Sequence, residues 1–202
     1  MESGSDTGWC RVNKNRLEAF SDGVVAIAIT IMVLNLKIPR GTGWREISAI
    51  APLLLSYLLS FIYVGIYWVN HHHLMQPVHS VNGLILWANL HLLFWLSLIP
   101  FVTAWVSVDP YASPPVAIYG VVLLMSSFAF LLLGKALLAK EGKNSRLALA
   151  LGNGRKNQVS IFLYILAILL SLWNGIAGLC VYVAVAALWF VPDRHIENLG
   201  WD

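Results

Sequence analysis

The stretch FSDGVVAIAITIMVLNLKIP, residues 20–39, decides the fold. After Asp22 it runs for 14 residues, 23 to 36, without a charged side chain, with Thr30 among aliphatic residues. A run of this kind is typical of a buried core helix, a membrane anchor or the wall of a pore. The rest of the chain separates these alternatives.

The composition of the whole chain places it in a lipid bilayer. Of 202 residues, 58% are hydrophobic and 11% are charged, against about 25% charged in an ordinary soluble domain, and the mean hydropathy is +0.72. The basic excess, 13 Lys and Arg against 10 Asp and Glu, is too small for a nucleic-acid surface. Cys10 lies in a polar leader and Cys180 in an apolar run, so we expect free thiols.

The spacing of uncharged runs predicts six membrane spans in one domain, residues 1–202. A span needs about 20 apolar residues, and runs of this kind fall at about 17–38, 47–69, 81–106, 115–139, 157–172 and 174–191. The last two divide one uncharged stretch, 157–192, because it is too long for a single span and has turn residues at 171–175. We therefore expect an all-α membrane protein.

The basic residues predict the topology of these spans. An even number of spans puts both termini on one side. With the N-terminus inside, the outer segments hold only Lys37, Arg40 and Arg45. The cytoplasmic segments hold Arg11, Lys14, Arg16, Lys135, Lys140, Lys143, Arg146, Arg155, Lys156 and Arg194. The positive-inside rule therefore predicts a multi-pass protein of the cell membrane with cytoplasmic N- and C-termini.

The segment KEGKNSRLALALGNGRK, residues 140–156, is the only sizeable basic loop. Leu147, Leu149 and Leu151 could seat a short interfacial helix on anionic lipid, and a solvated connector fits the segment equally well.

Polar residues in the predicted spans exclude several kinds of function. The histidines of Asn70-His71-His72-His73 suggest a metal site, but no Asp or Glu occurs from 47 to 108, so we expect polar contacts between helices and no metal. The chain lacks GxSxG and paired carboxylates in mid-span, so we expect neither an enzyme nor a cofactor. Without ionisable groups at mid-span, passive permeation is favoured over the alternatives, a secondary transporter or a non-conducting membrane scaffold.

The first span carries one narrow face of interest. At about 100° per residue, Gly23, Ile27, Thr30, Ile31 and Leu34 share that face, and Ser21 and Asp22 point away from it. As a pore wall, this face would be hydrophobic with one layer of hydroxyl groups. Any membrane helix shows aliphatic stripes, however, and a lone threonine often bonds to its own i−4 carbonyl. Spacing alone leaves both interpretations open.

Four short motifs point to a known family. Arg16-x-x-x-Phe20-Ser21-Asp22 resembles the RxxxFSD signature of the transmembrane protein 175 potassium channels, which include bacterial members. Trp68-Val69-Asn70-His71, Asn89 and the closing Val191-Pro192-Asp193-Arg194 are similar to the family as well. The resemblance covers nearly the whole chain as a single six-span unit and is strongest in the first span.

The resemblance implies a homotetramer whose first helices line a central pore. Ile27, five residues after the signature aspartate, would form the constriction, Thr30 would favour potassium, and Leu34 would form the next aliphatic layer. The signature residues Arg16, Ser21 and Asp22 would bond to the second and third helices. We expect their partners among Trp68, His71 and Asn89.

The expected function is a leak-like potassium channel with modest selectivity. The TVGYG filter of other potassium channels is absent, so selectivity would come from partial dehydration at the aliphatic ring and from the Thr30 hydroxyls. No Arg-rich helix or ligand domain suggests a gate. The partners would be a further three copies of the chain and membrane lipid, with no nucleic acid, and K+ as the permeant ion.

Overall fold

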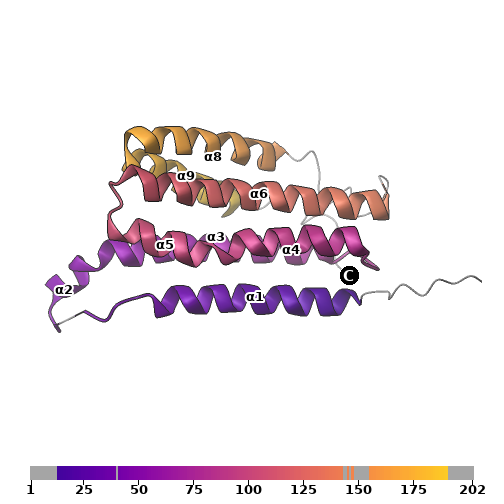
Figure 1. Ribbon diagram of the computed structural model, residues 1–202, viewed down its shortest axis with the longest axis horizontal. Helices are drawn as coiled ribbons and strands as arrows, with labels where there is room; N and C mark the ends of the chain where they lie inside the picture. Colours follow the sequence, from indigo (N-terminus) through magenta and orange to yellow (C-terminus); the bar gives the residue numbers. More distant parts are fainter. Residues whose placement is uncertain (1–12, 40, 143–144, 146, 148–154, 191–202) are drawn as a thin grey trace, which may run out of the picture.

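The computed structural model describes residues 13–39, 41–142, 145, 147 and 155–190. Within these residues the regular elements are helices. They are α1 (Lys14–Leu34), α2 (Trp44–Ala49), α3 (Ala51–Met75), α4 (Gly83–Ser97), α5 (Ile99–Val108), α6 (Ser113–Glu141), α8 (Arg155–Trp173) and α9 (Gly175–Phe190). The long helices lie roughly side by side, with α1 at one edge of the bundle and α8 near the other (Figure 1).

Some sequence-based expectations concern residues outside the described ranges. These are the predictions for Cys10, Arg11, Arg40, Lys143, Arg146, Leu149, Leu151, the motif Val191-Pro192-Asp193-Arg194 and its basic residue Arg194.

Five helical segments are long and apolar enough to cross a membrane. They are Lys14–Leu34, Ala51–Met75, Gly83–Val108, Ser113–Glu141 and Lys156–Trp173, the third of which combines α4 and α5. A shorter apolar helix covers Gly175–Trp189. The expectation of an all-helical membrane protein is therefore confirmed. The helix α3 continues to Met75, beyond the apolar run that ends near residue 69, so the three consecutive histidines are helical.

Local sequence explains where helices begin and break. Asn13 caps α1 by accepting the N–H of Asn15 at 3.0 Å, and Asn82 caps α4 by accepting the N–H of Ile85 at 3.0 Å. The third span is interrupted at Leu98, between α4 and α5. Pro100 accounts for this break because it has no N–H to donate and its ring crowds the carbonyl of the preceding turn.

The helix α6 forms the centre of the bundle and packs against α4, α5, α8 and α9. Buried hydroxyl groups join the helices around it: Tyr119 Oη on α6 lies 3.0 Å from Ser60 Oγ on α3, and Tyr63 Oη on α3 donates to the carbonyl of Tyr182 on α9 at 2.6 Å. Gly120 allows the closest approach, because a Cβ at this position would overlap the Tyr182 hydroxyl. These contacts satisfy polar groups that lipid could not.

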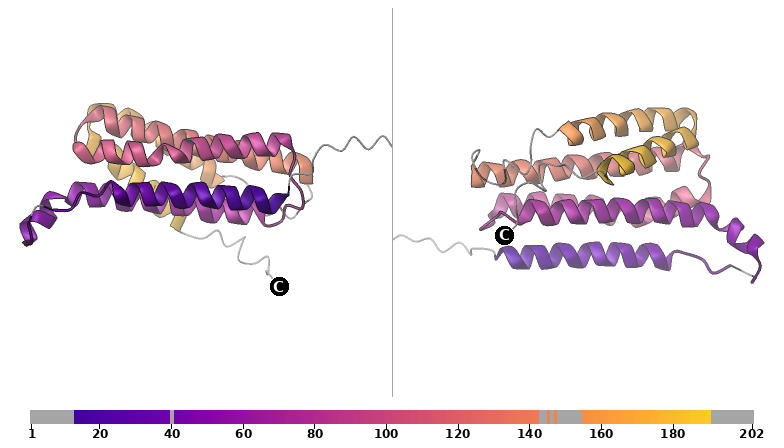
Figure 2. Two further views of the ribbon diagram at one scale, coloured as in Figure 1. Left: turned by 60° about the horizontal axis from the view of Figure 1, so that its bottom comes forward. Right: turned by 180° about the vertical axis from the view of Figure 1, so that it is seen from behind.

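The helix α1 is peripheral. It packs mainly against α3, α4 and α5. Seen from behind, α1 runs along the outside of the bundle, and no other described helix lies on its far side (Figure 2). One face of α1 is thus left for contacts outside this single chain.

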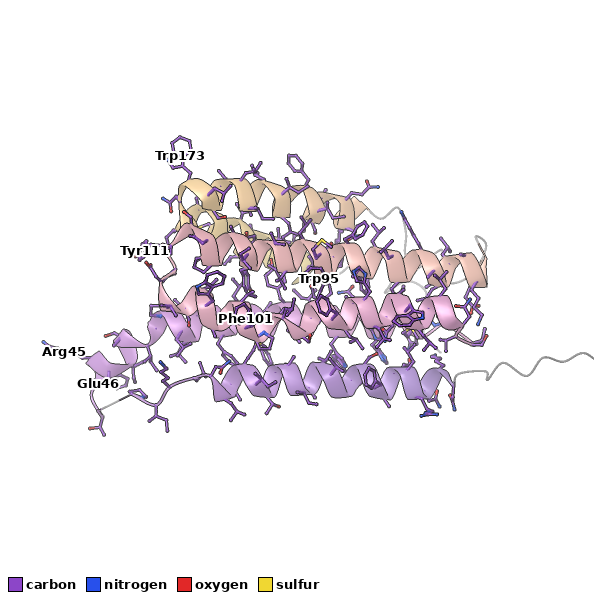
Figure 3. The ribbon with its side chains drawn as sticks, viewed as in Figure 1. Arg45, Glu46, Trp95, Phe101, Tyr111 and Trp173 are labelled. Carbon is purple, nitrogen blue, oxygen red and sulfur yellow. The ribbon has the colours of Figure 1, made fainter. Side chains whose placement is uncertain are left out.

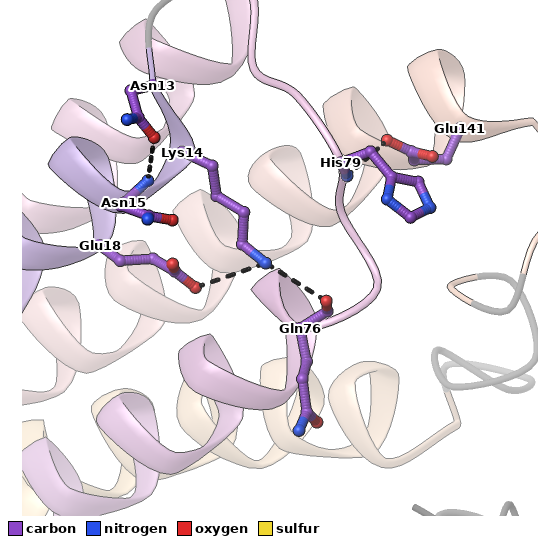
Figure 4. Close-up of polar contacts among 7 residues, drawn as sticks. All are labelled: Asn13, Lys14, Asn15, Glu18, Gln76, His79 and Glu141. Carbon is purple, nitrogen blue, oxygen red and sulfur yellow. Dashed lines mark hydrogen bonds and ion pairs between the residues drawn. The ribbon is translucent and has the colours of Figure 1, made fainter.

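Polar contacts hold the α3–α4 connection at the end of the bundle where α1 begins (Figure 4). Lys14 Nζ donates to the carbonyl of Gln76 at 3.2 Å and lies 3.9 Å from Glu18 Oε1. The backbone N–H of His79 donates to Glu141 Oε1 at 3.4 Å. The start of α1 and the end of α6 are therefore tied to the same short connection.

The opposite end of the bundle carries aromatic and charged side chains. Figure 3 shows Arg45 and Glu46 on α2, with Tyr111 and Trp173, at this end. Tyr111 is 73% exposed and Trp173 is 92% exposed. Aromatic side chains at the end of a bundle are typical of the level where a membrane meets water.

Candidate ion pathway along α1

Within the single chain, the helix α1 has one buried face and a broad face that the other described helices leave uncovered. Its buried residues are Leu17, Ser21, Val25, Ala28 and Met32. The stripe that the sequence predicts as a pore wall lies on the other side. Ile27 is 60% exposed and Leu34 is 76% exposed, and Gly23, Thr30 and Ile31 are exposed as well. The five residues thus share one helix face that the helices of their own chain leave uncovered.

The Thr30 hydroxyl bonds within its own helix. Thr30 Oγ1 donates to the carbonyl of Ala26 at 2.8 Å, the i−4 bond that threonine often makes in helices. Because the proton is used in this bond, the lone pairs of the oxygen remain available as acceptors. The local bond therefore leaves Thr30 able to face a cation with oxygen rather than with hydrogen.

A buried chain of hydrogen bonds connects the inner face of α1 to α4 and α3. Ser21 Oγ donates to the carbonyl of Leu17 at 2.8 Å and accepts from Asn89 Nδ2 at 2.9 Å. Asn89 Oδ1 lies 2.9 Å from His71 Nε2. Ser21 and Asn89 are each 2% exposed, and His71 is 7% exposed.

This chain of bonds has one consistent set of proton positions. The Ser21 proton is used on Leu17, so Ser21 must accept from the amide of Asn89. The amide oxygen of Asn89 can only accept, so His71 carries its proton on Nε2. Each of the three side chains therefore depends on the next, and together they set the rotation of α1 against its neighbours.

The signature aspartate bonds to a tryptophan on α3. Trp68 Nε1 donates to Asp22 Oδ1 at 2.9 Å. The Trp68 ring is 45% exposed and stacks on the ring of His72, with centroids 6.3 Å apart. Asp22 thus sits at the side of α1 against α3, away from the exposed stripe.

Arg16 differs from the sequence-based expectation. Its side chain is exposed and makes no hydrogen bond or ion pair with α3, α4 or any other described residue. The reason is helical phase: at about 100° per residue, Arg16 falls within about 20° of Ile27 and faces away from the bundle. Of the signature residues, only Ser21 and Asp22 bond to the neighbouring helices within the described chain.

The histidines near the end of α3 do not gather around a common point. In the described part of the chain, no group of three His, Cys, Asp or Glu side chains is placed to hold a metal ion. His91 Nε2 accepts from Trp95 Nε1 at 3.0 Å. The rings of His72 and His73 lie 5.8 Å apart in an edge-to-face contact.

Sequence reasoning missed two features of this region. Phe20, 56% exposed, falls within about 20° of Ile27 by the same helical phase, so the exposed stripe continues toward the start of α1. Thr103 on α5 donates to Ser60 Oγ on α3 at 2.7 Å, which joins the two helices behind α1. Helical phase could have identified Phe20, whereas the Thr103 contact depends on how the helices pack.

Comparison with known proteins assigns the chain to a family. A family model described as the endosomal/lysosomal potassium channel TMEM175 matches residues 16–100. A potassium channel of Chryseobacterium sp. (strain P1-3) is 51% identical over 187 residues, which are 93% of this chain and 97% of that protein. A potassium channel of Streptomyces collinus (strain DSM 40733 / Tue 365) is 36% identical over 123 residues, 57% of this chain and 60% of that protein.

A solved structure has the same fold. The crystal structure of a lysosomal potassium-selective channel TMEM175 homolog from Chamaesiphon minutus matches with a TM-score of 0.75 and 26% sequence identity, over 88% of this chain and 96% of that chain. The match extends beyond the signature region to the later helices. With its RxxxFSD motif, its buried support for α1 and a relative matched over almost its entire length, the chain belongs to the TMEM175 family of ion channels.

Proposed function

We propose that the chain is the subunit of a homotetrameric, leak-like potassium channel in the cell membrane, with four α1 helices around the conducting axis. The observation that carries this proposal is the uncovered face of α1, where Ile27 is 60% exposed and Leu34 is 76% exposed. The relatives named as potassium channels support the choice of ion.

The spacing on that face supports packing of several α1 helices. Phe20, Gly23, Ile27, Thr30 and Leu34 are separated by three and four residues in turn. This is a repeat of about 3.5 residues, the spacing with which parallel helices keep one seam facing a common axis.

Ion selection would follow from two layers of this seam. Four Ile27 side chains form an apolar constriction at which an ion gives up part of its water, which costs less for K+ than for the more strongly hydrated Na+. One turn away, four Thr30 oxygens replace some of the lost water, because their protons are held by Ala26. Leu34 and Ile31 complete an apolar wall that binds ions too weakly to trap them.

The remaining helices would hold α1 in the correct rotation. The buried contacts of Ser21 with Asn89 and of Asp22 with Trp68 join α1 to both α4 and α3. A rotation of α1 by one residue, about 100°, would break both contacts and move Ile27 away from the axis. We infer that α9, although shorter than the others, is the sixth span, with both termini cytoplasmic.

The test is ion flux through purified protein in liposomes. With a K+ gradient and a proton carrier to balance charge, the protein should support K+ flux that does not saturate as transport by a carrier would. Na+ gradients should give a smaller flux. Saturable flux that requires a second ion would indicate a secondary transporter, and no flux from tetrameric protein would indicate a scaffold.

A further inference from the structure

The exposed stripe of α1 extends past the predicted pore residues toward the start of the helix. Phe20 is 56% exposed and contacts no other aromatic ring in the described chain. It lies seven residues before Ile27, one full repeat of the seam, so the two side chains stand about 10 Å apart along the same face. In a tetramer, four Phe20 rings would surround the axis on the cytoplasmic side of the Ile27 constriction.

Between these two layers the wall has no side chain. Gly23 is exposed, and an ideal Cβ built on it meets no atom within 4 Å. In the proposed tetramer, four copies of Gly23 would add no side chains to the space between the Ile27 layer and the Phe20 layer, and this space is called the chamber. The nearest hydroxyl on the seam, Thr30, lies beyond the Ile27 layer. The chamber is therefore lined by aliphatic side chains at its Ile27 end and by aromatic rings at its Phe20 end, without polar side chains from the seam.

The charges near the chamber are already engaged or lie outside it. The Asp22 carboxylate accepts from Trp68 at the side of α1, and Glu18 pairs with Lys14 at 3.9 Å. Arg16 lies one turn before Phe20, on the cytoplasmic side, with an exposed side chain. The chamber thus lacks anionic or hydrogen-bonding groups that would favour a small, strongly hydrated cation over an apolar one.

We propose that this chamber is a binding site for organic cations with apolar surfaces, of the tetraalkylammonium class, that enter from the cytoplasm and block conduction. The proposal rests on the tetrameric pore proposed above. Aromatic rings attract cations through their electron-rich faces, and alkyl arms bury their surface against Ile27 and the bare Gly23 backbone. A tetraalkylammonium ion has no N–H groups and carries its charge beneath alkyl groups, so entering a chamber without acceptors costs it less hydration free energy than it costs a small, strongly hydrated cation.

The test uses K+ currents in membrane patches from cells that express the full chain. Tetrabutylammonium applied to the cytoplasmic face should block, and the same concentration outside should act more weakly because the Ile27 layer lies between. Phe20→Leu keeps an apolar side chain and removes the ring, so the blocking concentration, measured relative to the unblocked K+ current of the same variant, should rise about three- to tenfold. Phe20→Trp, which carries the strongest cation-binding ring, should lower it.

Two further variants test the position of the site. Gly23→Ala adds four methyl groups to the chamber, so block by tetrabutylammonium should weaken more than block by tetramethylammonium. Arg16→Gln removes positive charge at the cytoplasmic opening, so block should become stronger. Equal block in the wild type, Phe20→Leu and Gly23→Ala would overturn the proposal.

A binding measurement separates failure of the site from failure of the channel. Tetrabutylammonium should raise the unfolding temperature of purified wild-type protein, and the rise should be smaller in Phe20→Leu. If the wild type conducts no K+ but shows this difference, the proposed channel function fails and the site stands. If K+ current is normal and neither block nor unfolding temperature depends on Phe20, the channel stands and the site fails.

Discussion

Asn89 on α4 donates a hydrogen bond of 2.9 Å to Ser21 on α1, at a place where both side chains are 2% exposed. The bond joins the signature motif of α1 to the third span. Because Asn89 also accepts from His71 on α3, a single amide connects three helices.

Asn89→Leu should therefore destabilise the protein. The change leaves His71 and Ser21 without one partner each, and a buried polar group left unpaired costs about 1 to 3 kcal/mol. Thermal unfolding of the purified protein measures the effect. Asn70→Leu is the control, since Asn70 bonds only to Ile66 of its own helix and is partly exposed. Equal losses in the two variants would contradict a special role for Asn89.

Asp22→Ala should reduce tetramer yield or thermal stability before it changes selectivity. The variant leaves Trp68 Nε1 without its acceptor, whereas Asp22→Asn keeps an oxygen in the same position. Asp22→Asn should therefore retain most of the stability, and Trp68→Phe should resemble Asp22→Ala. Size-exclusion chromatography and thermal unfolding give the comparison. A fully stable Asp22→Ala protein with altered ion preference would instead place this carboxylate in the pore.

Gly120→Ala should destabilise the bundle far from the proposed pore. The new methyl group overlaps the Tyr182 hydroxyl, which donates to the carbonyl of Val116 at 3.3 Å. Overpacking of this kind typically costs about 1 to 3 kcal/mol. Tyr182→Phe removes the overlapping oxygen and should recover part of the loss in the double variant. If the losses of thermal stability in Gly120→Ala and Tyr182→Phe add up in the double variant, the strain caused by the new methyl group lies elsewhere.

The sequence predicted the membrane class and the family, but only part of the detailed structure. Long uncharged runs identify spans because lipid excludes charge, and Pro100 marks the break between α4 and α5. The apolar run did not predict the end of α3 at Met75, because the histidines end the apolar run but the helix continues through them. Contacts such as Ser60 with Tyr119, 59 residues apart, depend on helix packing that no local pattern specifies.

The residues of the candidate ion pathway were likewise predicted only in part from the sequence. Helical phase from α1 alone grouped Ile27, Thr30 and Leu34, and the structure leaves that face exposed. The motif suggested partners for Asp22 and Ser21, and Trp68 and Asn89 lie at hydrogen-bond distance from them. The same motif misled for Arg16, because membership of a motif does not say on which side of the helix a residue lies.

Ile27→Ser should raise K+ current and weaken discrimination among cations. Four hydroxyls in place of four aliphatic side chains allow water to remain in the constriction, so an ion loses less of its hydration there. Ile27→Val keeps the apolar wall and should retain most of the wild-type selectivity. Single-channel conductance and reversal potentials test both. Unchanged conductance and selectivity in correctly assembled Ile27→Ser tetramers would place the narrowest point elsewhere.

Thr30→Val should reduce the preference for K+ over Na+ and retain conductance. Valine has nearly the shape of threonine, so the dimensions of the pore change little, but the oxygen whose proton is held by Ala26 is lost. Each lost contact with a partly dehydrated ion is worth about 1 kcal/mol, and a difference of about 1.4 kcal/mol between two ions is a tenfold change in preference. The ratio of K+ to Na+ permeability should therefore fall several-fold, as measured from reversal potentials with K+ on one side and Na+ on the other.

Thr30→Ser provides the matched control for this experiment. Serine keeps the hydroxyl and can make the same i−4 bond, so its reversal potential should stay near that of the wild type. If Thr30→Val also stays at the wild-type value, the hydroxyl serves only its own helix. Selectivity would then arise from dehydration at Ile27 alone, and Ile27→Ser should abolish it in the presence of an intact Thr30 layer.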